Sequence, residues 1–98
     1  MAQFDVYALM DGGVVVDCQA DHFANIATRV VVPLEPVADS HQQQVRLNPV
    51  FAVNGQQMML LTQFATAVRT AELRKPIDSL EHARLEIISA FDMLLTGN

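Results

Sequence analysis

The sequence has few of the residues on which several classes of protein depend. It contains one cysteine, Cys18, which excludes an intrachain disulfide and fits a reducing cytosol. Because Cys18 lies in a valine-rich segment, we predict a buried, inert thiol rather than a nucleophile. No apolar run reaches the length of a membrane span, and the N-terminal segment lacks the pattern of a secretion signal. We therefore expect a cytoplasmic protein without a membrane partner.

Basic residues are also scarce. The chain has 6 Lys and Arg against 11 Asp and Glu, which gives a net charge of −5. The bases are spread along the chain, and only Arg74 and Lys75 are adjacent. Independent binding to nucleic acid rests on a clustered basic face, so this composition disfavours it. An acidic domain of this kind is better suited to a basic protein partner.

Enzyme signatures are missing as well. The sequence has no glycine-rich phosphate loop, no Cys or His pair at metal-ligand spacing, and no nucleophile elbow. Its three histidines, His22, His41 and His82, fall in separate predicted elements, and isolated surface histidines need no function. We therefore expect no catalytic group, no metal and no cofactor.

Apolar residues, by contrast, are abundant. The chain of 98 residues is 51% hydrophobic and 17% charged, and its length predicts one domain over residues 1–98. A domain of this size buries little more than ~60% of its unfolded surface, and the polar residues available to cover a monomer are few. A self-complementary interface would hide the excess, so we predict a homodimer.

Alternation and turn residues predict an antiparallel sheet. Asp11-Gly12-Gly13 turns the chain between two strands, and Asn54-Gly55 gives the strongest hairpin signal in the sequence. A β-branched run after residue 28 predicts a central strand that is covered on both faces. The predicted strands are residues 4–10, 14–18, 29–32, 50–53 and 56–62, with a weaker one at 66–72. Residues 19–28 are a predicted loop, and residues 37–44 are predicted as a loop or a single helical turn.

The last predicted element is a helix over residues 78–96. Apolar residues recur there at three- and four-residue steps, which places them on one face. We predict that Asp78 and Glu81 cap the start of this helix and that Gly97 ends it in a left-handed conformation. The fold class is therefore mostly β with a C-terminal helix, in which five or six antiparallel strands are covered by one helix.

Two features of this helix go beyond what its own fold requires. Ile88 and Leu95 widen the apolar arc to about 160°, where one contact needs only somewhat more than 100°. The surplus predicts a second apolar neighbour, such as the same helix in another subunit. Asp92 puts an acid and no base in the last turn, where the helix dipole favours cations by about 0.3–1 kcal/mol. Asp92 is thus either a tolerated surface acid or a contact residue.

Five segments together resemble the CcdB family of toxins. They are Gln3-Phe4-Asp5-Val6-Tyr7, the run from Val16 to Asp21, the run from Arg29 to Leu34, Leu47-Asn48-Pro49 and the terminal helix. The resemblance covers essentially the whole chain in the same order. It implies an SH3-like barrel of the CcdB/Kid/MazF type, assembled as a two-fold homodimer.

The resemblance also implies a function. Members of this family are toxins of type II toxin–antitoxin pairs that poison DNA gyrase. The toxin dimer binds the gyrase A subunit and traps the complex in which DNA is cleaved. A CcdA-like antitoxin removes the toxin from gyrase and joins it in repressing their operon, so operator DNA is contacted only together with the antitoxin. Such a poison needs no catalytic residue.

The family's gyrase contacts imply two groups of positions in this chain. One group lies at the end of the helix, where Gly97 is kept and where Asp92, Thr96 and Asn98 stand in place of Asn, Trp and Ile. The other lies in the loop after the second strand, where Ala20 and His22 stand in place of Ser and Ile. The gyrase-binding positions implied by the resemblance are therefore Ala20, His22, Asp92, Thr96, Gly97 and Asn98.

Two other functions remain open. A MazF-like endoribonuclease shares the barrel, but RNA cleavage would need clustered bases and a positioned acid or base, which the charge pattern disfavours. The changed residues at the helix tip favour a dimer that keeps antitoxin binding but has lost its toxicity or acquired another target.

Overall fold

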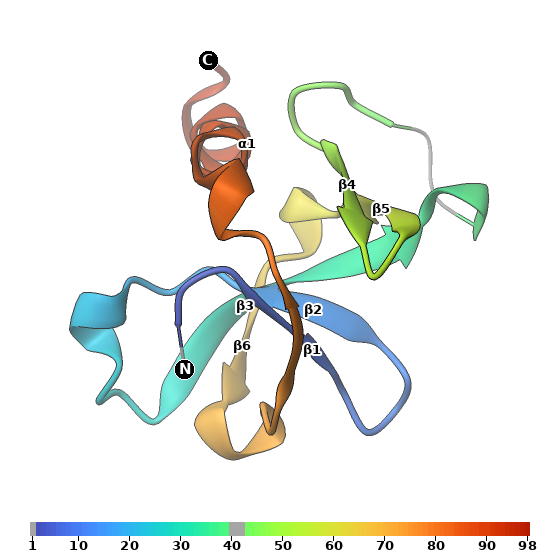
Figure 1. The fold of residues 1–98 in the computed structure, drawn as a ribbon. Helices are drawn as coiled ribbons and strands as arrows, with labels where there is room; N and C mark the ends of the chain where they lie inside the picture. The colour runs from blue at the N-terminus through green and yellow to red at the C-terminus, as the bar shows by residue number, and fades with distance from the viewer. Residues whose placement is uncertain (1, 40–42) are drawn as a thin grey trace.

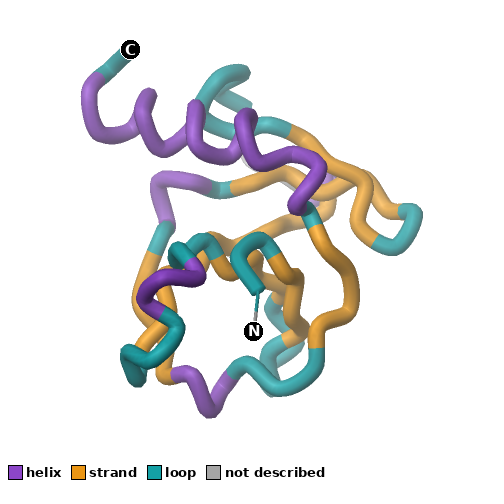
Figure 2. Tube along the Cα trace, turned by 60° about the vertical axis from the view of Figure 1, so that its left-hand side comes forward, coloured by secondary structure: helices purple, strands orange, loops and turns teal. Residues whose placement is uncertain are grey.

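The computed structural model describes residues 2–39 and 43–98, and within them it confirms the predicted fold class. An antiparallel sheet curls into a partly open barrel, and a single α-helix lies across one side of it (Figures 1 and 2). The strands are β1 (Asp5–Ala8), β2 (Val14–Asp17), β3 (Thr28–Pro36), β4 (Val50–Val53), β5 (Gln56–Leu60), β6 (Thr66–Arg69) and β7 (Pro76–Ser79), and the helix is α1 (Arg84–Thr96).

The longest strand, β3, organises the sheet. The strand order is β4-β5-β3-β2-β1-β7, and β6 pairs with β3 outside this path. Strand β3 pairs with β2 from Val31 to Leu34, with β5 from Leu34 onward, and with β6 from Thr28 to Val31. One long strand can serve three partners because its nine residues extend beyond each of them. Strands β4 and β7 are left at the two ends of the path.

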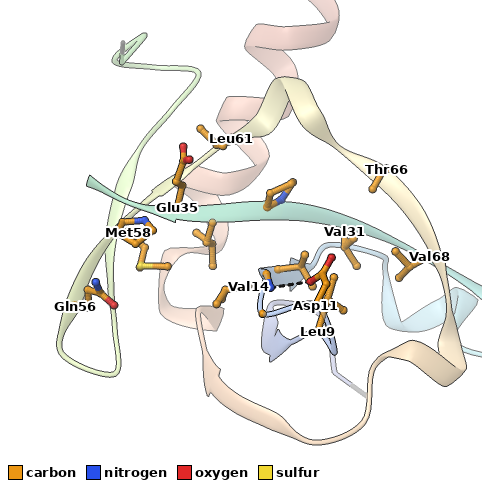
Figure 3. A pocket seen from close by; sticks show the side chains of 16 residues that line it. Leu9, Asp11, Val14, Val31, Glu35, Gln56, Met58, Leu61, Thr66 and Val68 are labelled. Atoms are coloured by element: carbon orange, nitrogen blue, oxygen red, sulfur yellow. Dashed lines mark hydrogen bonds between the residues drawn. The ribbon is translucent and has the colours of Figure 1, made fainter. Parts of the chain in front are cut away.

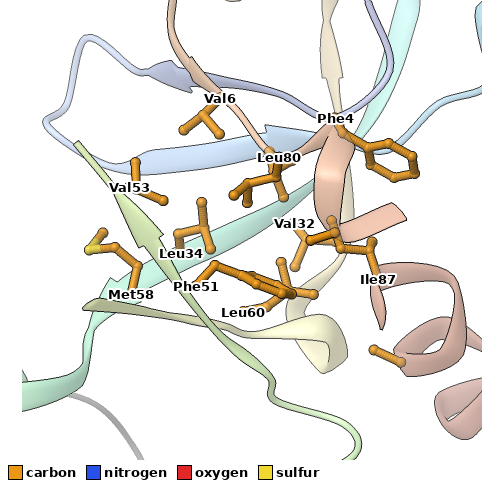
Figure 4. Packing of buried hydrophobic residues seen from close by; sticks show 13 residues of the cluster. Phe4, Val6, Val32, Leu34, Phe51, Val53, Met58, Leu60, Leu80 and Ile87 are labelled. Carbon is orange, nitrogen blue, oxygen red and sulfur yellow. The ribbon is translucent and has the colours of Figure 1, made fainter. Parts of the chain in front are cut away.

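Two apolar clusters fill the space on either face of the sheet. Val32 belongs to the larger cluster and Val31 to the smaller one, as expected for neighbours on a strand that is covered on both faces. Helix α1 closes the larger cluster with Ile87 and Ala90, both fully buried. Figure 4 shows Phe4, Val6, Val32, Leu34, Phe51, Val53, Met58, Leu60, Leu80 and Ile87 converging on this core.

Both predicted turn positions adopt the expected conformations. Asn54 and Gly55 have φ values of 49° and 81°, which is the double left-handed geometry of a tight hairpin turn between β4 and β5. Gly97 has φ 76° and ends α1 in the left-handed conformation, with its N–H donating to the Met93 carbonyl at 2.9 Å. These two turns depend on local sequence alone, and the sequence predicted both.

The predicted start of the helix was wrong. The α-helix begins at Arg84, after a single 3-10 turn at Glu81–Ala83, and no side chain caps it. Asp78 lies instead in β7, opposite Val6 of β1. Strand β7 was not predicted, and it raises the number of strands in the described residues to seven. The apolar residues Leu80 and Ala83 are nevertheless buried, because the 3-10 turn keeps them against the same core.

Other element boundaries differ by a few residues. The strand predicted at 66–72 ends at Arg69, and Thr70–Glu72 forms a 3-10 turn. The segment at 37–44, predicted as a loop or a single helical turn, begins with a 3-10 turn at Val37–Asp39. His41 lies outside the described residues. No helix in the described part of the chain is long and apolar enough to cross a membrane.

Candidate functional site

The end of α1 is a compact, internally bonded tip. The Thr96 hydroxyl donates to the Asp92 carbonyl at 2.7 Å, and the Asn98 N–H donates back to the Thr96 hydroxyl at 3.3 Å. Gly97 turns the chain between them. The tip thus has a defined shape that is determined by the helix and its left-handed stop.

The segment before β4 lies against this tip. The guanidinium of Arg46 donates to the Asn98 carbonyl, which places one positive charge near the carbonyl end of the helix. The last turn itself contains no base, and the Asp92 side chain is exposed. The helix end therefore receives its cation from a neighbouring segment rather than from its own sequence.

One side of α1 carries apolar side chains that the described residues cover only in part. Leu95 is 76% exposed and Ile88 is 37% exposed, and both lie beside the half-buried Phe91 at helical spacing. On the adjoining side of the wheel, Ile87 and Ala90 are fully buried in the core. The wide apolar arc predicted from the sequence is therefore real, and part of it faces outward.

The second predicted group lies in the loop after β2. Ala20 precedes a 3-10 turn formed by Asp21–Phe23, and His22 sits in that turn with an exposed side chain. The rings of His22 and Phe23 meet edge to face, with 4.9 Å between centroids. Phe23 and Ile26 are 49% and 47% exposed, so the loop presents an apolar surface around His22.

The sequence indicated His22 as a notable residue of this loop but missed Ile26. Ile26 could have been found from the sequence, because it is an apolar residue within a segment that has no helical or strand periodicity. Such a residue has no element to pack into, so exposure is the default expectation.

A buried ion pair supports the base of this loop. The carboxylate of Asp17 and the guanidinium of Arg29 lie 2.7 Å apart, and both side chains have no exposed area. Arg29 also donates through Nε to Asp17 at 2.9 Å. The sequence interpretation treated Arg29 as one of the dispersed bases, and the structure shows that it has no access to an external partner.

Within one chain, the two predicted groups lie apart. Asp92, Thr96, Gly97 and Asn98 gather at the end of α1, whereas Ala20 and His22 lie in the loop between β2 and β3, and both views separate them (Figures 1 and 2). A target that contacts both groups has to span this separation, or the groups have to be combined across two copies of the chain. The arrangement provides contact surfaces of apolar, hydroxyl and carboxylate groups.

The chemistry-bearing side chains elsewhere are dispersed. His22 and His82 lie in separate 3-10 turns, and no three His, Cys, Asp or Glu side chains of the described residues approach closely enough to hold a metal ion. Cys18 is free, and burial together with the nearby negative charge of Asp17 raises its pKa to about 12. The prediction of a weakly reactive thiol agrees with this raised pKa, but Cys18 is half-buried rather than buried as predicted.

A groove of about 630 Å³ lies on another part of the barrel, over the β1–β2 hairpin, β3 and β5 (Figure 3). Its walls are mostly apolar, and Asp11 and Glu35 contribute the acids. Asp11 is held in place by the Gly13 N–H, which donates to its carboxylate at 2.8 Å. None of the predicted gyrase-binding positions lines this groove.

Comparison with known proteins supplies the family. A family model described as CcdB protein matches residues 3–97. This chain belongs to the CcdB family. Membership places it in general terms among the toxins of toxin–antitoxin systems that act on gyrase. No curated protein matches the chain. The CcdB match includes both predicted groups of contact positions except Asn98, so the loop and the helix end are parts of the family domain.

Proposed function

We propose that this CcdB-family protein binds the gyrase A subunit and traps the complex in which DNA is cleaved. The observation that carries the proposal is the family match over residues 3–97. The exposed tip of α1 and the exposed loop around His22 supply surfaces on which such a contact can be built. The protein acts by binding and not as an enzyme, and it uses no metal or cofactor.

The functional unit in this proposal is a homodimer. The outward-facing apolar side chains Ile88 and Leu95 support it, because a second copy of the same helix would remove both from water. We expect Leu95→Asp to shift the protein toward a monomer in analytical ultracentrifugation. Leu85→Asp should act in the same direction, because Leu85 is 80% exposed and lies three residues before Ile88 on the same face of the helix. Glu86→Gln is the control, because Glu86 is exposed and points away from Ile88 and Leu95 on the helix wheel. A monomeric wild-type chain at micromolar concentration would contradict the dimer.

The remaining partners follow from the family. A CcdA-like antitoxin removes the toxin from gyrase, and the two proteins together repress their operon by binding operator DNA. The net charge of −5 supports a role in which the toxin does not bind DNA by itself. Localisation in the cytoplasm is part of the proposal, since gyrase and the operon are found there.

The direct test uses purified gyrase and supercoiled plasmid. If the proposal holds, adding the protein produces linear, gyrase-linked DNA after denaturation, and prior addition of antitoxin prevents it. Intact plasmid at high protein concentration, with gyrase that responds to a known poison, would reject the proposal. Degradation of cellular RNA upon expression, with gyrase unaffected, would favour the endoribonuclease instead.

A second candidate is a CcdB-like dimer that has lost toxicity or changed its target. The observation that favours it is that Thr96 and Asn98 bond each other and the helix, so the tip's polar groups are partly used internally. An aromatic anchor at an interface can contribute 2 kcal/mol or more, and Thr96 cannot replace that contact area. Harmless overexpression in a host whose gyrase is sensitive, together with retained antitoxin binding, would favour this candidate.

A further inference from the structure

Gln19 connects the loop that carries His22 to the body of the barrel. Its side-chain Nε2 donates to the Phe23 carbonyl at 2.9 Å, and its Oε1 accepts from the Val30 N–H at 3.1 Å. One side chain therefore joins the 3-10 turn of the loop to strand β3. Figure 1 shows the segments that it connects, the loop after β2 and the start of β3.

The backbone of Gln19 is held at the same time. Its N–H donates to one carboxylate oxygen of Asp17 at 3.1 Å, and its carbonyl accepts from Arg29 at 3.4 Å. Asp17 and Arg29 are the fully buried ion pair, so they are fixed by their own bonds and by the core around them. The side chain of Gln19 consequently projects from a rigid base.

The contact with Val30 adds one hydrogen bond beyond the last backbone bond between β2 and β3. The last backbone bond between this edge of β3 and the chain leaving β2 is the Cys18 N–H to the Val30 carbonyl, at 2.8 Å. The next donor along, the Val30 N–H, is taken by the Gln19 side chain instead of by a strand. The Gln19 side chain thus takes the place of a strand at the end of the β2–β3 ladder, and it also holds the loop through the Phe23 carbonyl.

A second glutamine supports the loop from the other side. The side chain of Gln3 donates to the Cys18 carbonyl at 3.0 Å, and its N–H donates to the Asp21 carboxylate at 2.8 Å. Arg84, the first residue of α1, donates to the Gln3 side-chain oxygen at 2.8 Å. The loop is therefore also connected to the helix that carries the other group of contact positions.

We propose that Gln19 is a positioning residue that holds the loop around His22 in one orientation before a target binds. The proposal rests on the proposed function, since it assigns the loop to gyrase contact. Preorganising a contact loop improves affinity because less ordering remains to be done on binding. The Gln19 amide suits this role because it offers a donor and an acceptor at the same time, and each meets a partner in a different element.

The test compares two variants of the full chain with a matched control. Gln19→Met keeps the length of the side chain and removes both side-chain hydrogen bonds. Gln19→Glu keeps an oxygen for Val30 and removes the donor that faces Phe23. The control is Gln57→Met on the exposed part of β5, which makes the same substitution away from the loop.

The first readout is hydrogen exchange at loop amides. The N–H groups of Phe23, Ala24 and Ile26 donate within the loop at 3.0–3.1 Å, so they report its opening. We expect Gln19→Glu to exchange these amides about fivefold faster, which is the effect of one lost hydrogen bond, and Gln19→Met to exchange them at least that much faster because it loses two. The amide of Val32 in β3 should be unchanged. Unchanged loop exchange in Gln19→Glu, or equal acceleration in Gln57→Met, would overturn the proposal.

The second readout is affinity for the gyrase A subunit beside the melting temperature. We expect both variants to bind about fivefold more weakly. Asp78→Asn, which weakens hydrogen bonds outside the loop, should lower the melting temperature by a similar few degrees and leave the affinity unchanged, a split that a purely structural role would not give. Faster loop exchange with unchanged affinity would overturn the positioning role. If the wild type itself does not bind gyrase, the proposed function fails, and loop exchange alone decides whether Gln19 positions the loop. Should Gln19→Met fail to fold, Gln19→Glu decides.

Discussion

The carboxylate of Asp78 accepts a hydrogen bond from the backbone N–H of Asn54 at 2.9 Å. Asn54 lies at the tip of the β4–β5 hairpin, and Asp78 lies in β7, so this bond joins the two ends of the strand path. The other oxygen of Asp78 accepts from the Ser79 N–H at 2.7 Å. One side chain thus links the edges that backbone pairing leaves open.

The Asp78 link predicts a dependence of stability on pH. The bond from Asn54, then the bond from Ser79, lower the pKa of Asp78 below its ordinary value, and the charge of His82 adds to this. A depressed pKa contributes stability that is present above the unfolded value of about 3.9 and is lost as the pH falls through the folded pKa. We expect Asp78→Asn to be less stable than wild type at pH 6. The difference in free energy of unfolding should be under about 1 kcal/mol, because water screens the partly exposed carboxylate. This difference should shrink below about pH 4.

Urea unfolding across this pH range measures the effect. Glu81→Gln is the control, because it removes an exposed acid from the following 3-10 turn and leaves the hairpin contact in place. A stability difference between wild type and Asp78→Asn that stays constant from pH 6 to pH 3 would refute the link.

The Asp17–Arg29 pair predicts a large loss of stability when one partner is removed. Arg29→Met leaves the Asp17 carboxylate buried and without its ion-pair partner, which typically costs about 3–5 kcal/mol, a large part of the roughly 5–15 kcal/mol net stability of a small domain. The double variant Asp17→Val with Arg29→Met replaces both charges by apolar groups and should recover part of that loss. Equilibrium unfolding of wild type, Asp17→Val, Arg29→Met and the double variant gives the coupling energy. A double variant less stable than Arg29→Met would contradict the account.

We predict that the Cys18 thiol is alkylated slowly in the folded protein. Burial raises its pKa to about 12, and its thiol contacts the Val16 carbonyl at 3.7 Å. Only the thiolate reacts, so alkylation by iodoacetamide at pH 8 should be slower by about 100-fold or more in the native state than in denaturant, where the pKa is near 8.5. Native and unfolded rates within tenfold of each other would show that the thiol is open to solvent and more acidic.

We predict that neutralising the Asp92 carboxylate stabilises the protein. Its carboxylate lies in the last turn of α1, where the helix dipole disfavours an acid by about 0.3–1 kcal/mol. Asp92→Asn should therefore raise the melting temperature by roughly 2–5 °C and leave the fold intact. Glu86→Gln is the opposite control, because Glu86 lies in the first turn, where an acid is favourable. A lower melting temperature for Asp92→Asn would contradict the prediction.

Part of the candidate site could be predicted because it depends on short-range sequence. The stop at Gly97, with Thr96 as the last helical residue before it and Asn98 beyond it, follows from the preference of glycine for positive φ. The apolar stripe from Ile87 to Leu94 follows from helical spacing. The exposed loop around His22 follows from the absence of any period between two strands. The bonds that hold that loop could not be predicted, because Gln19 meets Val30 only after β2 and β3 have paired.

The sequence by itself determined the class of the fold, its hairpin turn at Asn54-Gly55 and the end of its helix, because alternation, helical period and positive φ are properties of neighbouring residues. Only the tertiary structure decided that residues 76–79 form a strand, since their partner β1 lies some seventy positions earlier and its pairing energy overrides the local preference of Asp78 for a helix cap. It also decided that Arg29 is buried, because a charge can leave water only where a partner such as Asp17 is already in place.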